Sequence, residues 1–110
     1  LLAAVVLSLA PWRGPSLPTA SADAIKYKLT VHGTPRQSVQ LSASGLPDGW
    51  VASFCTPHIC APFHYTLQLG RRGSGTIEFQ AIRVDDGAPS RVRVVVSAPD
   101  ANTVTVNISK

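Results

Sequence analysis

The sequence is poor in several residue types, and each shortage narrows the range of possible structures. It has no methionine, two cysteines and 6% aromatic residues among 110 positions. Charged residues make up 15% and hydrophobic residues 45%, a globular composition unlike that of disordered chains. The apolar run at residues 1–10 is about half as long as the ~20 residues that a membrane-spanning helix needs. At this length we expect one folded domain.

The motifs that carry common catalytic chemistry are also missing. The adjacent carboxylates Asp85 and Asp86 point to opposite faces of an extended chain and cannot converge on one bond. No segment resembles the nucleophile elbow of serine hydrolases. The glycine-rich stretch 70–75 lacks the Lys-Ser/Thr ending of a phosphate-binding loop. We therefore expect a protein that is not an enzyme and that needs no cofactor.

The start of the chain has the composition of an export signal. Residues 1–10 are apolar except for Ser8, and a Pro/Ser/Thr-rich stretch follows them. The small residues Ala20 and Ala22 form the A-x-A pattern that signal peptidases accept. An N-terminal membrane anchor or a buried core helix is the alternative interpretation of this segment.

Cleavage is expected before Asp23, which divides the chain into a signal peptide, residues 1–22, and a mature domain, residues 23–110. Since neither Met nor a Lys/Arg cluster precedes Leu1, we expect the leader to be truncated at its start. The mature domain is expected to be secreted or periplasmic, with no stable membrane insertion after the leader is removed.

After the predicted cut, apolar residues recur at every second position, which is the period of a β-strand. Turn-forming Gly, Pro, Asp and Asn residues separate the runs, and no segment has helical periodicity. Two sheets packed face to face can bury such one-sided strands. The sequence thus predicts an all-β fold, an immunoglobulin-like antiparallel β-sandwich of about seven strands. The predicted strands are residues 25–32, 39–43, 50–55, 65–69, 77–81, 91–96 and 103–108.

The two cysteines, Cys55 and Cys60, are expected to form a disulfide, because export places them in an oxidising compartment. Closing a loop of about six residues should stabilise the fold by roughly 2 kcal/mol. Such a bond would pin the loop that leaves the third predicted strand. It would not link the two sheets as the cystine of antibody domains does.

A metal site is the alternative for this segment. The spacing disfavours zinc, because one residue separates His58 from Cys60, fewer than in typical structural sites. A cupredoxin-like copper site is disfavoured because at least three predicted strands follow the loop and because the chain has no Met for the axial position. The alternative function is therefore a periplasmic copper- or zinc-binding protein, with the ligands Cys55, His58, Cys60 and His64.

The charge pattern bears on possible partners. The formal net charge is +4, but the basic residues are spread along the chain without a basic stripe, so we expect no nucleic-acid binding. Four of them could share one solvent-facing surface and contact anionic glycans or lipid headgroups. The alternative is that they keep the protein soluble and protect the sheet edges. These four are Arg91, Arg93, Lys26 and Lys28.

The segment from Gly45 to Ser97 contains GLPDGWVASFCTPHIC, then an alternating strand, a Gly-rich turn and GTIEFQAI. This pattern resembles the immunoglobulin-like modules of bacterial secreted proteins. Similar modules occur in exported proteins of Bacteroidetes-type bacteria and beside secreted glycosidases. The resemblance implies a non-catalytic accessory, binding or structural module. In this module the turn and core tryptophan would be Leu46, Pro47, Gly49 and Trp50, and the cysteine pair Cys55 and Cys60.

Loops commonly carry the binding residues of a β-sandwich. We expect two loops at one end of the domain, Thr56 to Phe63 and Asp85 to Pro89, to contact the partner. The partner is expected to be a protein or a glycan, and the sequence does not identify it.

Overall fold

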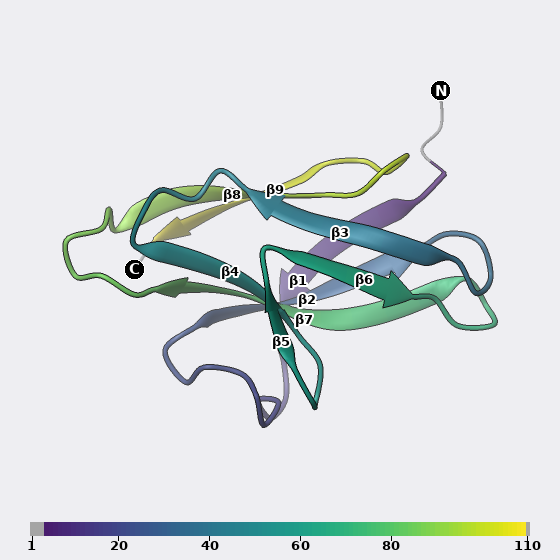
Figure 1. Cartoon of the computed structure of the whole chain (residues 1–110), viewed down its shortest axis with the longest axis horizontal. Helices are drawn as coiled ribbons and strands as arrows, with labels where there is room; N and C mark the ends of the chain where they lie inside the picture. The colour runs from purple at the N-terminus through teal and green to yellow at the C-terminus, as the bar shows by residue number, and fades with distance from the viewer. Residues whose placement is uncertain (1–3, 110) are drawn as a thin grey trace.

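The computed structural model describes residues 4–109, which form strands and connections with no helix among them. Figure 1 shows the strands arranged in two layers. The strands of this part of the chain are β1 (Val6–Pro11), β2 (Ile25–His32), β3 (Ser38–Ser44), β4 (Trp50–Cys55), β5 (Cys60–Pro62), β6 (His64–Gln68), β7 (Ser74–Arg83), β8 (Arg91–Ser97) and β9 (Val104–Ser109).

The strands form two antiparallel sheets, so the predicted all-β sandwich is confirmed. The first sheet has the order β1-β2-β7-β4-β5, and the second has the order β6-β3-β8-β9. All seven predicted strands are present, with bounds that differ by a few residues. The described residues contain nine strands rather than about seven. The two additional ones are β1, in the segment predicted to be a leader, and the short β5 after the cysteine loop.

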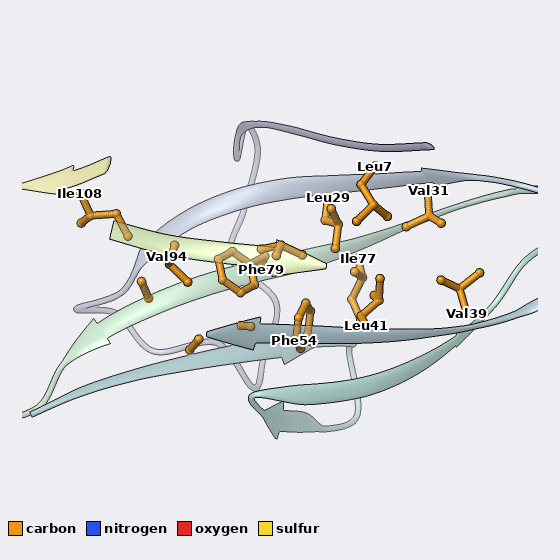
Figure 2. Packing of buried hydrophobic residues seen from close by; sticks show 14 of the residues in the cluster. Leu7, Leu29, Val31, Val39, Leu41, Phe54, Ile77, Phe79, Val94 and Ile108 are labelled. Carbon is orange, nitrogen blue, oxygen red and sulfur yellow. The ribbon is translucent and has the colours of Figure 1, made fainter. Parts of the chain in front are cut away.

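The core lies between the sheets and follows from the period-two pattern. In β3 the buried residues Val39, Leu41 and Ala43 alternate with more exposed polar ones. The central strand β7 contributes Phe79, whose ring centroid lies 5.1 Å from that of Phe54 on β4. Figure 2 shows these rings between the two layers, among aliphatic side chains from both sheets. Burial of this apolar surface is the main stabilising contribution to the fold.

Phe63 connects the two sheets between β5 and β6. Its N–H donates to the carbonyl of Ala52 in the first sheet at 2.9 Å, and its carbonyl accepts from the N–H of Ala43 in the second sheet at 2.8 Å. Its φ of 64° lies in the left-handed region, which is uncommon for a residue with a side chain. The chain thus changes sheets within one residue while its backbone hydrogen bonds stay satisfied.

Part of the segment predicted to be a leader, Val6–Pro11, is a strand in the described fold, and residues 1–3 of that segment lie outside the described residues. β1 pairs antiparallel with β2, and Val5 and Leu7 are 0% and 2% exposed. Neither a core helix nor a helical anchor is seen here, and no helix in residues 4–109 is long and apolar enough to cross a membrane. The reason is that a short apolar run suits a buried strand as well as a signal sequence. Cleavage before Asp23 stays a prediction, because the structure describes the uncut chain.

Candidate functional site

The disulfide lies within one sheet, as predicted. Cys55 ends β4, Cys60 begins β5, and the two face each other directly in the antiparallel register with their Cα atoms 4.0 Å apart. The turn between them is held by Thr56, whose N–H donates to the Ile59 carbonyl at 2.7 Å and whose hydroxyl accepts from the N–H of His58 at 3.2 Å. The bond therefore closes a short hairpin at the edge of the first sheet.

A connecting segment covers the outer face of the first sheet beside this disulfide. We call residues 12–24, between β1 and β2, the strap. The carbonyl of Thr19 lies 3.1 Å from Cys60 Sγ, and the N–H of Ser21 donates to Gln80 Oε1 at 3.1 Å. Gln80 Nε2 in turn contacts Cys55 Sγ at 2.6 Å. As a result, Gln80 is 1% exposed although its strand position points away from the core.

Glu78 is buried under the same strap. It is 0% exposed, and neither carboxylate oxygen accepts a hydrogen bond from the described residues. It lines a cavity of about 220 Å³ together with Trp12 and Leu17 of the strap. Burial raises the pKa of the Glu78 carboxyl above its ordinary value, and the positive charge of Lys26 lowers it by a smaller amount. The uncut chain thus holds an acid in a poorly solvated position.

The LPDGW turn packs against the loop between β7 and β8. Gly49 has a φ of 92°, and a Cβ at this position would lie 2.6 Å from the Cβ of Ala88. Trp50 is 3% exposed, and its indole N–H donates to the Pro89 carbonyl at 2.8 Å. Leu46 packs against the core, whereas Pro47 is exposed. Glycine is needed here both for the backbone conformation and for the close approach of the loop.

The two loops expected to form one contact surface are at different ends of the sandwich, so that prediction is wrong. Asp85 to Pro89 packs beside Gly49 and Trp50 at the start of β4, and the cysteine turn follows Cys55 at the end of β4. The six residues of β4 separate them. Figure 1 shows the β7–β8 connection and the β4–β5 turn far apart. The sequence could not show this, because it depends on the sheet to which each strand belongs.

The four proposed metal ligands do not form a site in the described residues. Cys55 and Cys60 share a disulfide, so neither offers a thiolate. His58 is exposed in the hairpin turn, and His64 begins β6 in the other sheet, where its Nδ1 lies 3.2 Å from Ser42 Oγ. Residues 4–109 contain no group of three or more His, Cys, Asp or Glu side chains that could hold a metal ion.

The outer face of the second sheet carries polar side chains on all four of its strands. Alternate residues of its four strands point outward and carry hydroxyl, amide, imidazole or guanidinium groups, interrupted by the half-buried Val95. The described strands β3, β6, β8 and β9 contain no Asp or Glu. We call this surface the polar face. Its members are Ser38, Gln40, Ser42, Ser44, His64, Thr66, Gln68, Arg91, Arg93, Thr105, Asn107 and Ser109.

The register places the two arginines of the polar face next to hydrogen-bonding neighbours. Arg91 faces Ser109, and Arg93 faces Asn107, across the β8–β9 ladder. These four residues, together with the inward-facing Val92 and Ile108, line a shallow groove of about 400 Å³ at the end of this ladder. A guanidinium flanked by hydroxyl and amide groups can bind a carboxylate or sulfate in a bidentate manner.

Lys26 and Lys28 do not share this surface, which corrects the prediction that four basic residues lie on one face. Both are on β2 in the first sheet, opposite Gln80 and Glu78 of β7. Lys26 donates to Ser16 Oγ of the strap. The two pairs of basic residues therefore lie on opposite outer faces of the sandwich. Their alternation was visible in the sequence, but the assignment of each strand to a sheet was not.

Comparison with known proteins identifies a fold relationship. The sequence matches no family model and no curated protein sequence. Its structure is similar to the crystal structure of a FixG-related protein from Vibrio parahaemolyticus, with a TM-score of 0.56 and 14% sequence identity. The match covers 97% of this chain and 97% of that chain. At this identity the likeness concerns the fold alone.

The polar face is the feature that the sequence analysis did not assign. Its signal was present as period-two polar positions in four of the predicted strands. Those strands are separated along the chain, and β4 and β7 of the other sheet lie between them in sequence. Only the pairing of β3 with β6 and β8, and of β8 with β9, combines their outward residues into one surface.

Proposed function

We propose that this chain is a non-catalytic, extracytoplasmic binding module whose polar face binds an anionic glycan. The observation that carries this proposal is the polar face itself, with hydrogen-bonding groups on four strands and two arginines but no carboxylate. Hydroxyl and amide side chains can bond the hydroxyl groups of a sugar, and Arg91 and Arg93 can pair with its acidic groups. A polar surface that crosses four strands offers several contact points to an extended polymer.

Two features support a location outside the cytoplasm for the mature protein. The Cys55–Cys60 disulfide fits an oxidising compartment, where such bonds persist. The leader-like composition of residues 1–22 fits export and cleavage before Asp23. The proposal therefore assigns the mature protein to the periplasm or the cell exterior.

The strand order supports an immunoglobulin-like type of sandwich. In such domains one sheet has the order A-B-E-D, and the other contains C′-C-F-G. The orders β1-β2-β7-β4 and β6-β3-β8-β9 fit this scheme when strands are matched by position. The chain departs from the scheme in one respect, because β4, in the place of strand D, precedes β6, in the place of strand C′. Accessory modules with this architecture bind ligands without catalysing reactions on them.

Binding to an acidic and a neutral polysaccharide tests the proposal. Polygalacturonate and dextran serve as probes in affinity electrophoresis or calorimetry. We expect binding to polygalacturonate, with little binding to dextran. Replacing both Arg91 and Arg93 by Gln should weaken it at least about tenfold, because two charge-assisted contacts are lost. Raising the ionic strength from about 0.15 M to about 1 M should weaken it as well.

The matched control replaces Arg71 and Arg72 by Gln. These residues are exposed in the turn between β6 and β7, outside the polar face, and the variant has the same net charge. We expect it to bind within about twofold of the wild type, a change close to the scatter expected for distant surface sites. Equal losses in the two double variants would show non-specific charge attraction and would end the proposal, as would no binding to polygalacturonate.

A further inference from the structure

The edge of the first sheet holds β1 in a slot with two walls. One wall is β2, which pairs with β1 from Val6–His32 to Pro11–Tyr27 in antiparallel register. The inward side chains of Val5 and Leu7 are 0% and 2% exposed. Figure 2 shows Leu7 beside Leu29 and Val31 of β2. We call this place the strand slot.

The second wall is the turn between β8 and β9, which belongs to the other sheet. Val5 forms a parallel bridge with Ala101, and its N–H donates to the Asp100 carbonyl at 3.0 Å. The side chain of Asn102 holds the backbone of Leu7 at two points. Its Oδ1 accepts from the Leu7 N–H at 2.7 Å, and its Nδ2 donates to the Leu7 carbonyl at 3.0 Å.

These contacts recognise a peptide backbone rather than a particular sequence. The amide of Asn102 matches the N–H and the carbonyl of a single residue, a pair of groups that every non-proline residue of an extended polypeptide offers. The β2 edge adds ladder hydrogen bonds of the same kind. Side-chain selection is left to three inward positions, the buried Val5 and Leu7 and the half-buried Leu9, because Val6, Ser8 and Ala10 are exposed.

The occupant of the slot is the segment that has the composition of a cleavable leader. Its removal would leave β2 as an unpaired edge beside an open apolar groove, which is unfavourable in water and a template for another strand. We propose that the strand slot is an acceptor site for an extended segment of a partner protein, with apolar residues at three alternate positions, aligned antiparallel to β2. In this scheme β1 fills the slot before cleavage, and the partner strand fills it afterwards.

The inference rests on the export and cleavage included in the proposed function, but it can be tested on the full chain without either. A recognition sequence for a specific protease is inserted after Gly14, where a Cβ would meet nothing within 4 Å. Cutting there leaves β1 in place without its covalent connection. A fluorescent peptide with the sequence of residues 4–13 is the probe, and its anisotropy reports uptake as it exchanges with the original fragment.

We expect the cut chain to take up one peptide per molecule. A peptide with Leu7→Asp should bind at least about 100-fold more weakly, because it would bury a carboxylate. A peptide with Val6→Ser, altered at an exposed position, should bind within about threefold of the unchanged one. The Asn102→Ala chain should bind the unchanged peptide about tenfold more weakly, because two hydrogen bonds to the backbone are lost.

Three outcomes would overturn the inference. The cut chain could keep its β-sheet circular dichroism but take up no peptide, or it could lose that signal without recovery by the peptide. The third is equal binding of the Leu7→Asp and the unchanged peptides. None of these outcomes bears on the polar face, which lies on the other sheet. Failure of glycan binding would conversely leave the exchange experiment unchanged, so failure of the polar face and failure of the strand slot can be distinguished.

Discussion

Glu78 on β7 and Cys55 on β4 lie directly opposite each other in antiparallel register, on the outer face of the first sheet. Both are 0% exposed, because the strap crosses this face. Neither oxygen of the Glu78 carboxyl has a hydrogen-bond partner in residues 4–109. The strap therefore buries Glu78, whose position on β7 points away from the core. Several properties of the chain follow from this arrangement and from the contacts of β1 and β4.

Replacing Glu78 by Gln should stabilise the uncut chain at neutral pH. Burial raises the pKa of the Glu78 carboxyl in the folded chain above its value in the unfolded chain. The stability that this shift contributes is fully present at a pH below the pKa of the unfolded chain, and it is lost as the pH rises through the pKa of the folded chain. We expect the Tm of E78Q to exceed that of the wild type by roughly 4 °C near pH 7, for about 1 kcal/mol. The difference should vanish near about pH 3, where the carboxyl is protonated in both states.

Thermal unfolding followed by circular dichroism across this pH range measures the effect. The control is Asp86→Asn, which removes an exposed carboxyl and should change the Tm by less than about 2 °C at each pH. A stabilisation by E78Q that increases on acidification would contradict the assignment.

Reducing the Cys55–Cys60 disulfide should lower the free energy of unfolding by about 2 kcal/mol, since the bond closes a loop of about six residues in the unfolded chain. Urea unfolding with and without a reductant gives this value from the shift in midpoint. Mass spectrometry should show a loss of about two daltons relative to the free thiols and no bound metal. The double variant Cys55→Ser, Cys60→Ser should not respond to the reductant. Free thiols with stoichiometric copper or zinc would support the metal-binding alternative instead.

Gly49→Ala should destabilise the chain by at least about 2 kcal/mol, because the residue has a positive φ and its Cβ would approach Ala88. Gly70→Ala is the matched control. Gly70 is not among the positive-φ glycines, and its added Cβ would be no closer than 3.5 Å to the Ser74 carbonyl oxygen. Chemical unfolding should show a change below about 1 kcal/mol for this control. Equal effects of the two substitutions would mean that the turn tolerates an L-residue at Gly49.

Leu7→Ala in the uncut chain should cost about 3 kcal/mol, the range observed for removing a buried leucine side chain. Val6→Ala, one residue earlier on the same strand, should cost less than about 1 kcal/mol because Val6 is 49% exposed. The comparison of their urea midpoints shows whether β1 packs in solution as it does in the structure. Similar small effects at both positions would show that it does not.

The strands themselves could be predicted from local pattern. The bounds predicted for β2 and for β4 are those observed. Each of these segments has apolar residues at alternate positions, and one-sided burial requires this spacing in a sheet. The disulfide could also be predicted from local sequence, because a separation of five positions allows a hairpin in which the two cysteines face each other. The turn at Gly49 could be predicted from its neighbouring residues in the same way.

The function of the apolar run at residues 1–10 could not be decided in this way. An apolar stretch of this length suits a signal sequence or a buried strand, and nothing within it distinguishes the two. The burial of Val5 and Leu7 depends on β2 and on the turn at Asn102, which is more than 90 positions away in sequence. The burial of Glu78 likewise depends on the strap and not on the strand that carries it.

The sequence by itself determined that the chain is all-β, where most strands begin and end, and that its two cysteines can pair, because each of these properties depends on neighbours a few residues apart. The tertiary structure decided which strands share a sheet. That choice separated Lys26 from Arg91, placed the two expected contact loops at opposite ends of β4, and joined the outward residues of four strands into the polar face. The physical reason is that sheet membership is selected by the joint packing of all the apolar faces, which no single segment specifies.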